Sequence, residues 1–232
     1  MNYAPLPQRL SNFMTYLARQ MTDGAEKLPS LNELSDELGM SIASLREELQ
    51  VARVLGLVEV KPRTGIRCLP YRFAPAVTKS LAFAVSVTPD SFRHYSDLRN
   101  HIEASYWYQA VSSLTDSDIE ELQGIIRTAN EKLQSDPIQI PQEEHRHLHI
   151  TIYRRLQNEF VHGILEAYWD IYEAVGLSVY EDRKYLERVW LYHQLMVDSI
   201  ASHDYLSGYQ ALIAHMDLLF QREKEPTILP FE

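Results

Sequence analysis

Four histidines in the C-terminal half of the chain have the type and spacing needed to bind a metal ion. His145 and His149 are four residues apart, and His193 and His215 lie in two later segments. Residues four apart on a helix share one face, so two imidazoles at this spacing can share one metal. Helices of a bundle can bring the later histidines inward, and neutral imidazole suits Zn, Ni, Fe or Mn. The sequence predicts a transition-metal site, although a lone buried histidine is more often a hydrogen-bonded core residue.

The segments that must position these histidines have helical periodicity. Apolar residues recur at three and four positions in six segments, and we expect helices near 90–113, 116–134, 141–156, 158–178, 182–203 and 205–223. Three prolines between residues 70 and 90 mark a boundary, with a short helix expected near 77–84. The pattern predicts a linker over 73–90 and an all-α bundle of six or seven helices over 91–226.

The first 72 residues have a different order of elements. Helical patterning over 8–22 precedes a capping box of Ser30 and Glu33, and a second potential N-cap, Ser41, opens a third helix. Alternating segments at 57–60 and 66–69 then flank a turn, which is typical of a β-hairpin. Three helices followed by a hairpin predict a winged helix-turn-helix, which places its third helix in the major groove of DNA. The predicted fold class is thus mainly α.

The charge and the histidine content of the chain both differ between its N-terminal and C-terminal parts. The formal net charge is −10, yet residues 1–75 hold nine Lys/Arg against eight Asp/Glu, and all nine histidines lie after residue 90. This asymmetry predicts two functions on one chain. The candidates for contact with double-stranded DNA are the start of the third helix and the basic hairpin, namely Ser41, Ser44, Arg46, Lys61, Arg63, Thr64, Gly65 and Arg67. A solvated helix face and a polar turn are the alternative reading.

Two groups of motifs resemble a known family. LPSLNELSDELGMSIASLREEL and LGLVEVKPRTGIRCL resemble the winged-helix domain of GntR-type transcription regulators. DLRNHIE (97–103), HRHLHITIYRRLQNEF (145–160), His193 and His215 resemble the ligand-binding FCD domain of their FadR subfamily. Asn32 and Ile42 stand where that family commonly has arginine, whereas Arg46 and Gly65 match it.

The resemblance also implies a ligand set for the metal. Metal-binding FCD domains usually combine an Asp-x3-His pair with two later histidines, and His145 stands at the position of the aspartate. The implied site has four histidines, or three with a water or ligand, or an altered metal preference. Replacing a carboxylate by a neutral imidazole favours Zn or Ni over Mn or Mg.

Arg99 is a candidate for binding a small organic acid beside the metal. A guanidinium binds a carboxylate bidentately, but an ion pair with Glu103, four residues later, is equally compatible with the sequence. Tyr153, Asn158 and Tyr192 are weaker candidates for the same pocket.

Several function classes are disfavoured by composition. The single cysteine, Cys68, excludes an internal disulfide and a CxxC zinc site. No apolar run is long enough to cross a membrane and no signal peptide is recognisable, so we expect a cytoplasmic protein.

We expect a homodimeric DNA-binding regulator, a repressor rather than an activator, and not an enzyme. The alternatives are a sensor acting through protein partners without reading DNA sequence, and a metal-dependent enzyme. For the enzyme, Glu143, Glu144 and Asp198 are candidate bases, but HExxH is absent from the sequence.

Overall fold

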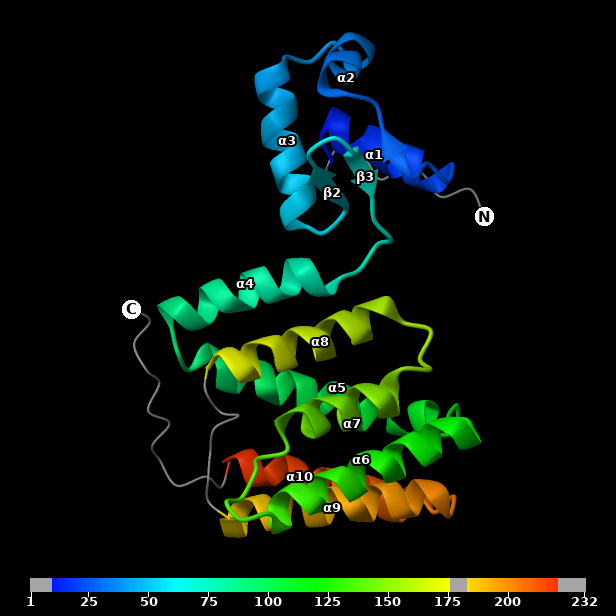
Figure 1. Ribbon diagram of the computed structural model, residues 1–232, viewed down its shortest axis with the longest axis vertical. Coiled ribbons are helices and arrows are strands. Elements are labelled where there is room, and N and C mark those ends of the chain that lie inside the picture. Colours follow the sequence, from blue (N-terminus) through cyan, green and yellow to red (C-terminus); the bar gives the residue numbers. More distant parts are fainter. Residues whose placement is uncertain (1–9, 176–182, 221–232) are drawn as a thin grey trace. The chain divides into compact units, whose positions relative to one another are not determined.

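The protein divides into two compact units, residues 1–76 and 77–232, which are described separately. The computed structural model describes residues 10–175 and 183–220 (Figure 1). Among the helices described, none is long and apolar enough to cross a membrane.

The first unit is a winged helix-turn-helix, as predicted. It contains α1 (Asn12–Thr22), β1 (Lys27–Leu28), α2 (Leu31–Leu38), α3 (Ile42–Val54), β2 (Val58–Lys61) and β3 (Gly65–Cys68). Serine side chains cap the helices: Ser30 forms a capping box with Glu33, and Ser41 accepts a hydrogen bond from the backbone N–H of Ser44. The helices pack on a small core whose fully buried members include Phe13, Leu17, Leu34, Leu45 and Ala52.

The sheet of this unit has one strand more than the predicted hairpin. Its order is β1-β3-β2, and both pairs are antiparallel. Lys27 pairs with Arg67 and Leu28 with Ile66. A two-residue strand has no detectable alternation, which is why periodicity did not reveal β1.

The second unit is the predicted all-α bundle, with seven helices among its described residues. They are α4 (Ala74–Val87), α5 (Ser91–Val111), α6 (Asp116–Gln134), α7 (Gln142–Tyr153), α8 (Glu159–Ala174), α9 (Arg183–Ala201) and α10 (Tyr205–Phe220). The six helices expected after residue 90 are all present. Residues 176–178, 182 and 221–223 of the predicted ranges lie outside the described residues. Helix α4 is longer at both ends than the predicted 77–84 and occupies much of the expected linker.

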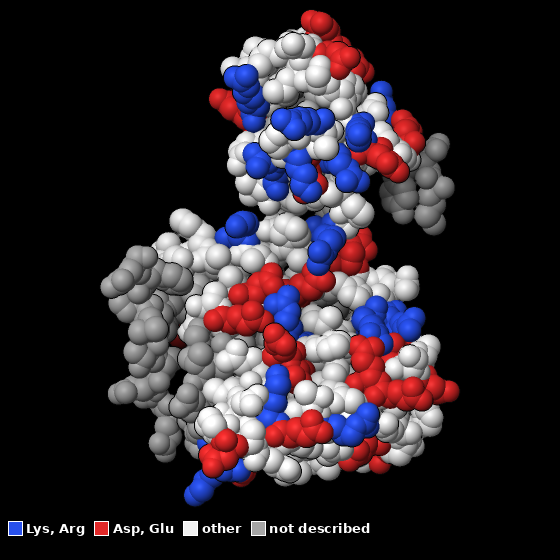
Figure 2. Space-filling view, viewed as in Figure 1, with Lys and Arg blue, Asp and Glu red and all other residues white. Residues whose placement is uncertain are grey.

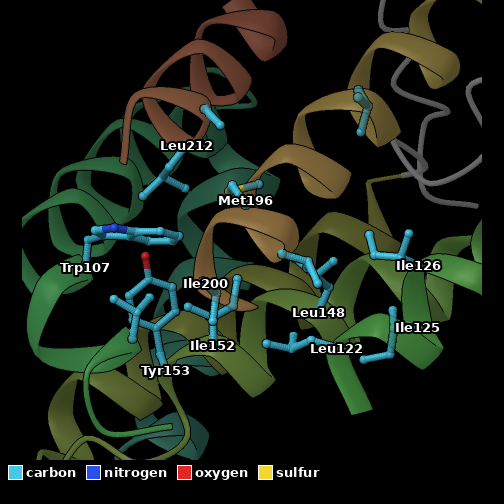
Figure 3. Close-up of a cluster of buried hydrophobic side chains, with 14 of the residues drawn as sticks. Trp107, Leu122, Ile125, Ile126, Leu148, Ile152, Tyr153, Met196, Ile200 and Leu212 are labelled. Atoms are coloured by element: carbon cyan, nitrogen blue, oxygen red, sulfur yellow. The ribbon is translucent and has the colours of Figure 1, made fainter. Parts of the chain in front are cut away.

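The bundle core brings distant helices together. Figure 3 shows side chains from α5, α6, α7, α9 and α10 within one cluster of buried residues. Trp107 of α5 is fully buried and donates a hydrogen bond from Nε1 to the carbonyl of Tyr205, 2.9 Å away. This packing sets the register of α7, α9 and α10, the helices that carry the four candidate metal ligands.

Candidate functional site

The four histidines converge inside the bundle. Helix α7 supplies His145 and His149, α9 supplies His193 and α10 supplies His215. One ring nitrogen from each lies within 4.8 Å of those from the other three. His149, His193 and His215 are buried, and His145 is half-buried. The sequence spacing placed only the first two on one face, and the tertiary structure adds the others.

The geometry and chemistry of this cluster fit a metal ion. The Nε2 atoms of His149 and His193 are 3.2 Å apart, and a tetrahedral zinc with bonds of about 2.0–2.1 Å separates its ligand nitrogens by about 3.3 Å. Within the described part of the chain, the buried Nδ1 atoms of His193 and His215 have no hydrogen-bond partner. If these histidines were only hydrogen-bonding residues of the core, their buried ring nitrogens would normally have hydrogen-bond partners.

Burial favours the neutral form of His149, His193 and His215, the form that binds metals. Desolvation, followed by the charge of Arg99, holds the pKa of His149 well below its usual value. Desolvation also lowers the pKa of His193 and of His215, with smaller contributions from neighbouring imidazoles. The nitrogen lone pairs are therefore available at neutral pH.

A buried arginine and a buried glutamate adjoin the cluster. Arg99 and Glu103 lie one turn apart on α5, with Arg99 Nη2 2.8 Å from Glu103 Oε1. The same Nη2 is 2.7 Å from His149 Nδ1, and Glu103 Oε1 is 3.2 Å from that nitrogen. Desolvation raises the pKa of Glu103 to about 7, although the charge of Arg99 opposes the shift. The ion pair that the sequence spacing allowed is present, and both of its side chains are buried.

A cavity opens beside these groups. Its walls carry charge, imidazole and aromatic rings: Arg99, Asn100, His145, Tyr168, Trp169, Tyr172, Tyr185, His215 and Met216. The guanidinium of Arg99 lies 4.7 Å from the ring centre of Tyr168 and 5.5 Å from that of Trp169. Cation–π contact thus adds to the ion pair with Glu103 in holding the guanidinium at the wall.

The other predicted ligand-binding residues have partners elsewhere. Tyr153 is buried and donates its hydroxyl proton to the backbone carbonyl of Glu103, 3.0 Å away. Asn158 caps α8 by accepting hydrogen bonds from the N–H groups of Phe160 and Val161. Tyr192 is half-buried and packs against the bundle core. The sequence indicates that these side chains carry polar atoms, but it does not show which direction each side chain faces.

Sequence reasoning missed part of the cavity wall. Trp169 and Tyr172 belong to this wall, and the sequence analysis considered Glu103 only as a partner of Arg99. The i, i+4 spacing of Arg99 and Glu103 was the available signal. His147, on the same helix as His145 and His149, is exposed, and its Nε2 lies 2.8 Å from Glu121 Oε1.

The predicted DNA-contacting residues lie on the surface of the first unit. Arg46 of α3 and the hairpin residues Lys61, Arg63, Thr64, Gly65 and Arg67 are exposed, and Ser44 is half-buried. Gly65 has φ +78°, the positive value expected for the turn. Figure 2 shows Lys and Arg gathered over the hairpin on the visible face of this unit. The oxygen of Ser41 is engaged in capping α3, so this residue sets where the helix begins.

Comparison with known proteins identifies the family. The FCD domain profile matches residues 95–218. The chain belongs to the GntR regulators that carry an FCD domain. Its relatives are transcription regulators rather than enzymes, as the sequence analysis predicted.

Two regulators and one solved structure illustrate this membership. The HTH-type transcriptional regulator LutR of Bacillus subtilis is 18% identical over 82% of this chain and 88% of its own length. The putative L-lactate dehydrogenase operon regulatory protein of Escherichia coli is 25% identical over 92% of this chain and 86% of its own. A Streptococcus agalactiae GntR structure superposes with a TM-score of 0.67 at 15% identity, covering 90% of this chain and 97% of that one. This FCD-type GntR regulator therefore shares its fold with GntR proteins.

Proposed function

We propose that this regulator changes its affinity for operator DNA when a small carboxylate binds beside a divalent transition metal in the helical bundle. One observation carries the proposal: four imidazoles from three helices converge next to a cavity whose wall contains Arg99. A metal and a guanidinium on one cavity wall are complementary to an organic acid.

The metal ligands in this proposal are His145, His149, His193 and His215. All four offer imidazole nitrogen rather than carboxylate oxygen, which favours Zn or Ni over Mn. When bound, the metal supplies a Lewis-acidic position for an oxygen of the effector. Arg99 supplies the second contact, because its guanidinium lies on the cavity wall.

The cavity is small and partly open to solvent, so we expect a small effector. The E. coli relative is named as a regulator of an L-lactate dehydrogenase operon, so L-lactate is the first acid to test. Tyr153, Asn158 and Tyr192 take no part in this proposal because their contacts lie elsewhere.

The DNA-binding part of the proposal uses the exposed surface of the first unit. Arg46 and Ser44 on α3 approach base edges and phosphates, and the hairpin residues Lys61, Arg63, Thr64 and Arg67 contact the backbone around Gly65. A homodimer pairs two recognition helices on a palindromic site. Effector binding then shifts the equilibrium between two dimer states by its differential affinity for them, and the expected result is release of a repressed operator.

Metal analysis of untagged protein tests the metal site. We expect about one Zn or Ni per chain and, in His149→Ala, a loss of at least about 100-fold in Zn affinity, because a direct ligand is removed. His147→Ala is the matched control, since His147 lies on the same helix but faces Glu121. Equal affinity of His149→Ala and the unmodified protein would contradict the metal proposal.

Operator binding tests the regulatory part. The affinity for fragments of the regulator's own promoter should fall steeply with salt, because cationic side chains release counterions from phosphates. L-Lactate should weaken this binding in metal-loaded protein. A flat salt dependence would contradict DNA contact by the first unit, and the absence of any response across a panel of small organic acids would contradict the effector.

A further inference from the structure

The contacts around His149 determine which of its ring nitrogens carries the proton. An arginine N–H can only donate, and Arg99 Nη2 lies 2.7 Å from His149 Nδ1, so in this arrangement Nδ1 accepts. A neutral imidazole holds one proton, which then sits on Nε2 and points to His193 Nε2 at 3.2 Å. His149 in this arrangement is the Nε2–H tautomer.

Metal ligation requires the other tautomer. The nitrogen that His149 directs toward the cluster is Nε2, and a metal ligand must present a lone pair there. The ring proton must then sit on Nδ1, which becomes a donor. The ring charge does not change, because one proton leaves Nε2 and one is held at Nδ1.

Glu103 is the group that can accept this proton. Its Oε1 is 3.2 Å from His149 Nδ1, and neither carboxylate oxygen receives a well-directed hydrogen bond from any described residue. Both atoms belong to a side chain with 0% exposure. Oε1 forms the ion pair with Arg99 Nη2 at 2.8 Å, and a carboxylate oxygen has more than one lone pair, so Oε1 can also accept a hydrogen bond from the nitrogen that must donate.

Arg99 cannot keep its contact with His149 after this change. Two donors would face one another across 2.7 Å, so Nη2 must turn away from Nδ1. Arg99 still has its ion pair with Glu103, its Nη1 donates to Asn100 Oδ1 at 3.2 Å, and it lies on the cavity wall. The N–H released from His149 can therefore bind an anion in the cavity.

We propose that Glu103 is a positioning residue that holds His149 in its Nδ1–H tautomer, and that this tautomer releases Arg99 to bind a carboxylate. Metal and carboxylate then bind cooperatively through a change of hydrogen-bond partner at His149. The inference rests on the proposed function, since it requires a metal at the histidine cluster and an acid in the cavity.

Nitrogen-15 NMR of histidine-labelled protein tests the tautomer directly, using Zn²⁺ alone as the probe. We expect His149, assigned with a His149→Gln variant, to change from Nε2–H in chelator-treated protein to Nδ1–H with Zn²⁺. If Zn²⁺ does not bind, the proposed function fails and this inference fails with it. If Zn²⁺ binds and His149 keeps its proton on Nε2, the inference alone is overturned.

Substitution of Glu103 tests the positioning role. Glu103→Gln keeps the size but replaces the carboxylate by a weaker acceptor, and loss of a hydrogen-bond partner of a metal ligand lowers metal affinity by roughly 10–100-fold. Glu121→Gln is the matched control, because Glu121 contacts His147, which lies outside the cluster. Glu103→Asp should restore part of the affinity by restoring the carboxylate. Equal Zn²⁺ affinity of folded Glu103→Gln and the unmodified protein overturns the proposal.

Acetate tests the release of Arg99. In unmodified protein, acetate should shift the guanidinium ¹⁵N resonances of Arg99 with Zn²⁺ present and leave them unchanged after chelation. In Zn²⁺-saturated Glu103→Gln this shift should be reduced. An equal response of Arg99 to acetate with and without Zn²⁺ would show that His149 does not control the arginine.

Discussion

The two units place their functional side chains in opposite environments. In the first unit, Arg46 and the hairpin cations stand in solvent around a small core that they do not enter. In the second, His149, His193, Arg99 and Glu103 are buried inside the bundle. A surface that binds a large charged partner can be built on any stable scaffold. A site for a small ligand must be enclosed, so its functional side chains are buried and pack against the side chains of the core.

This contrast leads us to expect that replacing a charged residue lowers the free energy of unfolding strongly in the bundle and very little in the winged domain.

A second buried charge of the bundle, Asp118, allows this expectation to be tested away from the metal site. Its side chain has 0% exposure and accepts hydrogen bonds from Arg154 and Arg155 and from the backbone N–H of Thr115. The Asp118 side chain thus connects the start of α6 to the end of α7 by hydrogen bonds.

The largest expected effect on stability is that of Asp118→Asn. We expect the free energy of unfolding at pH 7 to fall by about 2 kcal/mol, less than for a fully buried pair because both arginines are partly in solvent. Urea denaturation measures this value. Asp116→Asn, an exposed carboxylate in the same helical turn, is the control and should change stability by less than about 0.5 kcal/mol.

The pH dependence of Asp118→Asn gives a second measure. Hydrogen bonds, first that from Arg155, hold the pKa of Asp118 well below its usual value. Since the folded state lowers this pKa, the carboxylate stabilises the fold above the unfolded value of about 4, and its contribution is lost as the pH falls below it. The difference between the two proteins should therefore shrink in acid. A difference that persists unchanged at pH 3 would contradict the electrostatic explanation.

A smaller effect is expected for Gly208→Ala in α10. A Cβ at this position would lie 2.7 Å from Cζ2 of Trp107 and 3.2 Å from Cβ of Ser199. Because Trp107 is fully buried, it has no free space to move into, and we expect a net loss of about 1 kcal/mol after the gain in helix propensity. Thermal unfolding measures the change.

Gly124→Ala in α6 is the control for Gly208. Its Cβ would meet only Arg127 Nη2 at 3.6 Å among the described atoms, an ordinary contact. We expect this substitution to stabilise the protein by up to about 1 kcal/mol through helix propensity alone. Opposite signs at the two glycines would show that packing of α10 on α5, and not helix propensity, sets the cost.

The smallest effect on stability is expected for Arg46→Ala. Its exposed side chain should contribute less than about 0.5 kcal/mol to the free energy of unfolding, while its removal should weaken operator binding by about 1–3 kcal/mol if it contacts a base. Calorimetric melting and a gel-shift titration measure the two quantities. A large loss of stability would break the contrast between the two units.

Much of the architecture could be read from local patterns. The capping serines Ser30 and Ser41, the turn at Gly65 and the helical periodicity after residue 90 predicted the winged helix-turn-helix and the bundle, because caps, turns and amphipathic faces are set by neighbours in sequence. Local patterns did not predict the strand at Lys27–Leu28, because its two residues form a strand only by pairing with β3, far along the chain.

The sequence by itself determined which residues can bind a metal and that His145 and His149 share a helical face. Only the tertiary structure decided that His193 and His215 join them, that Glu103 faces His149, and that Tyr153 and Asn158 are engaged elsewhere. The physical reason is that spacing along a helix defines a face, whereas the neighbour of that face depends on how several helices pack against one another.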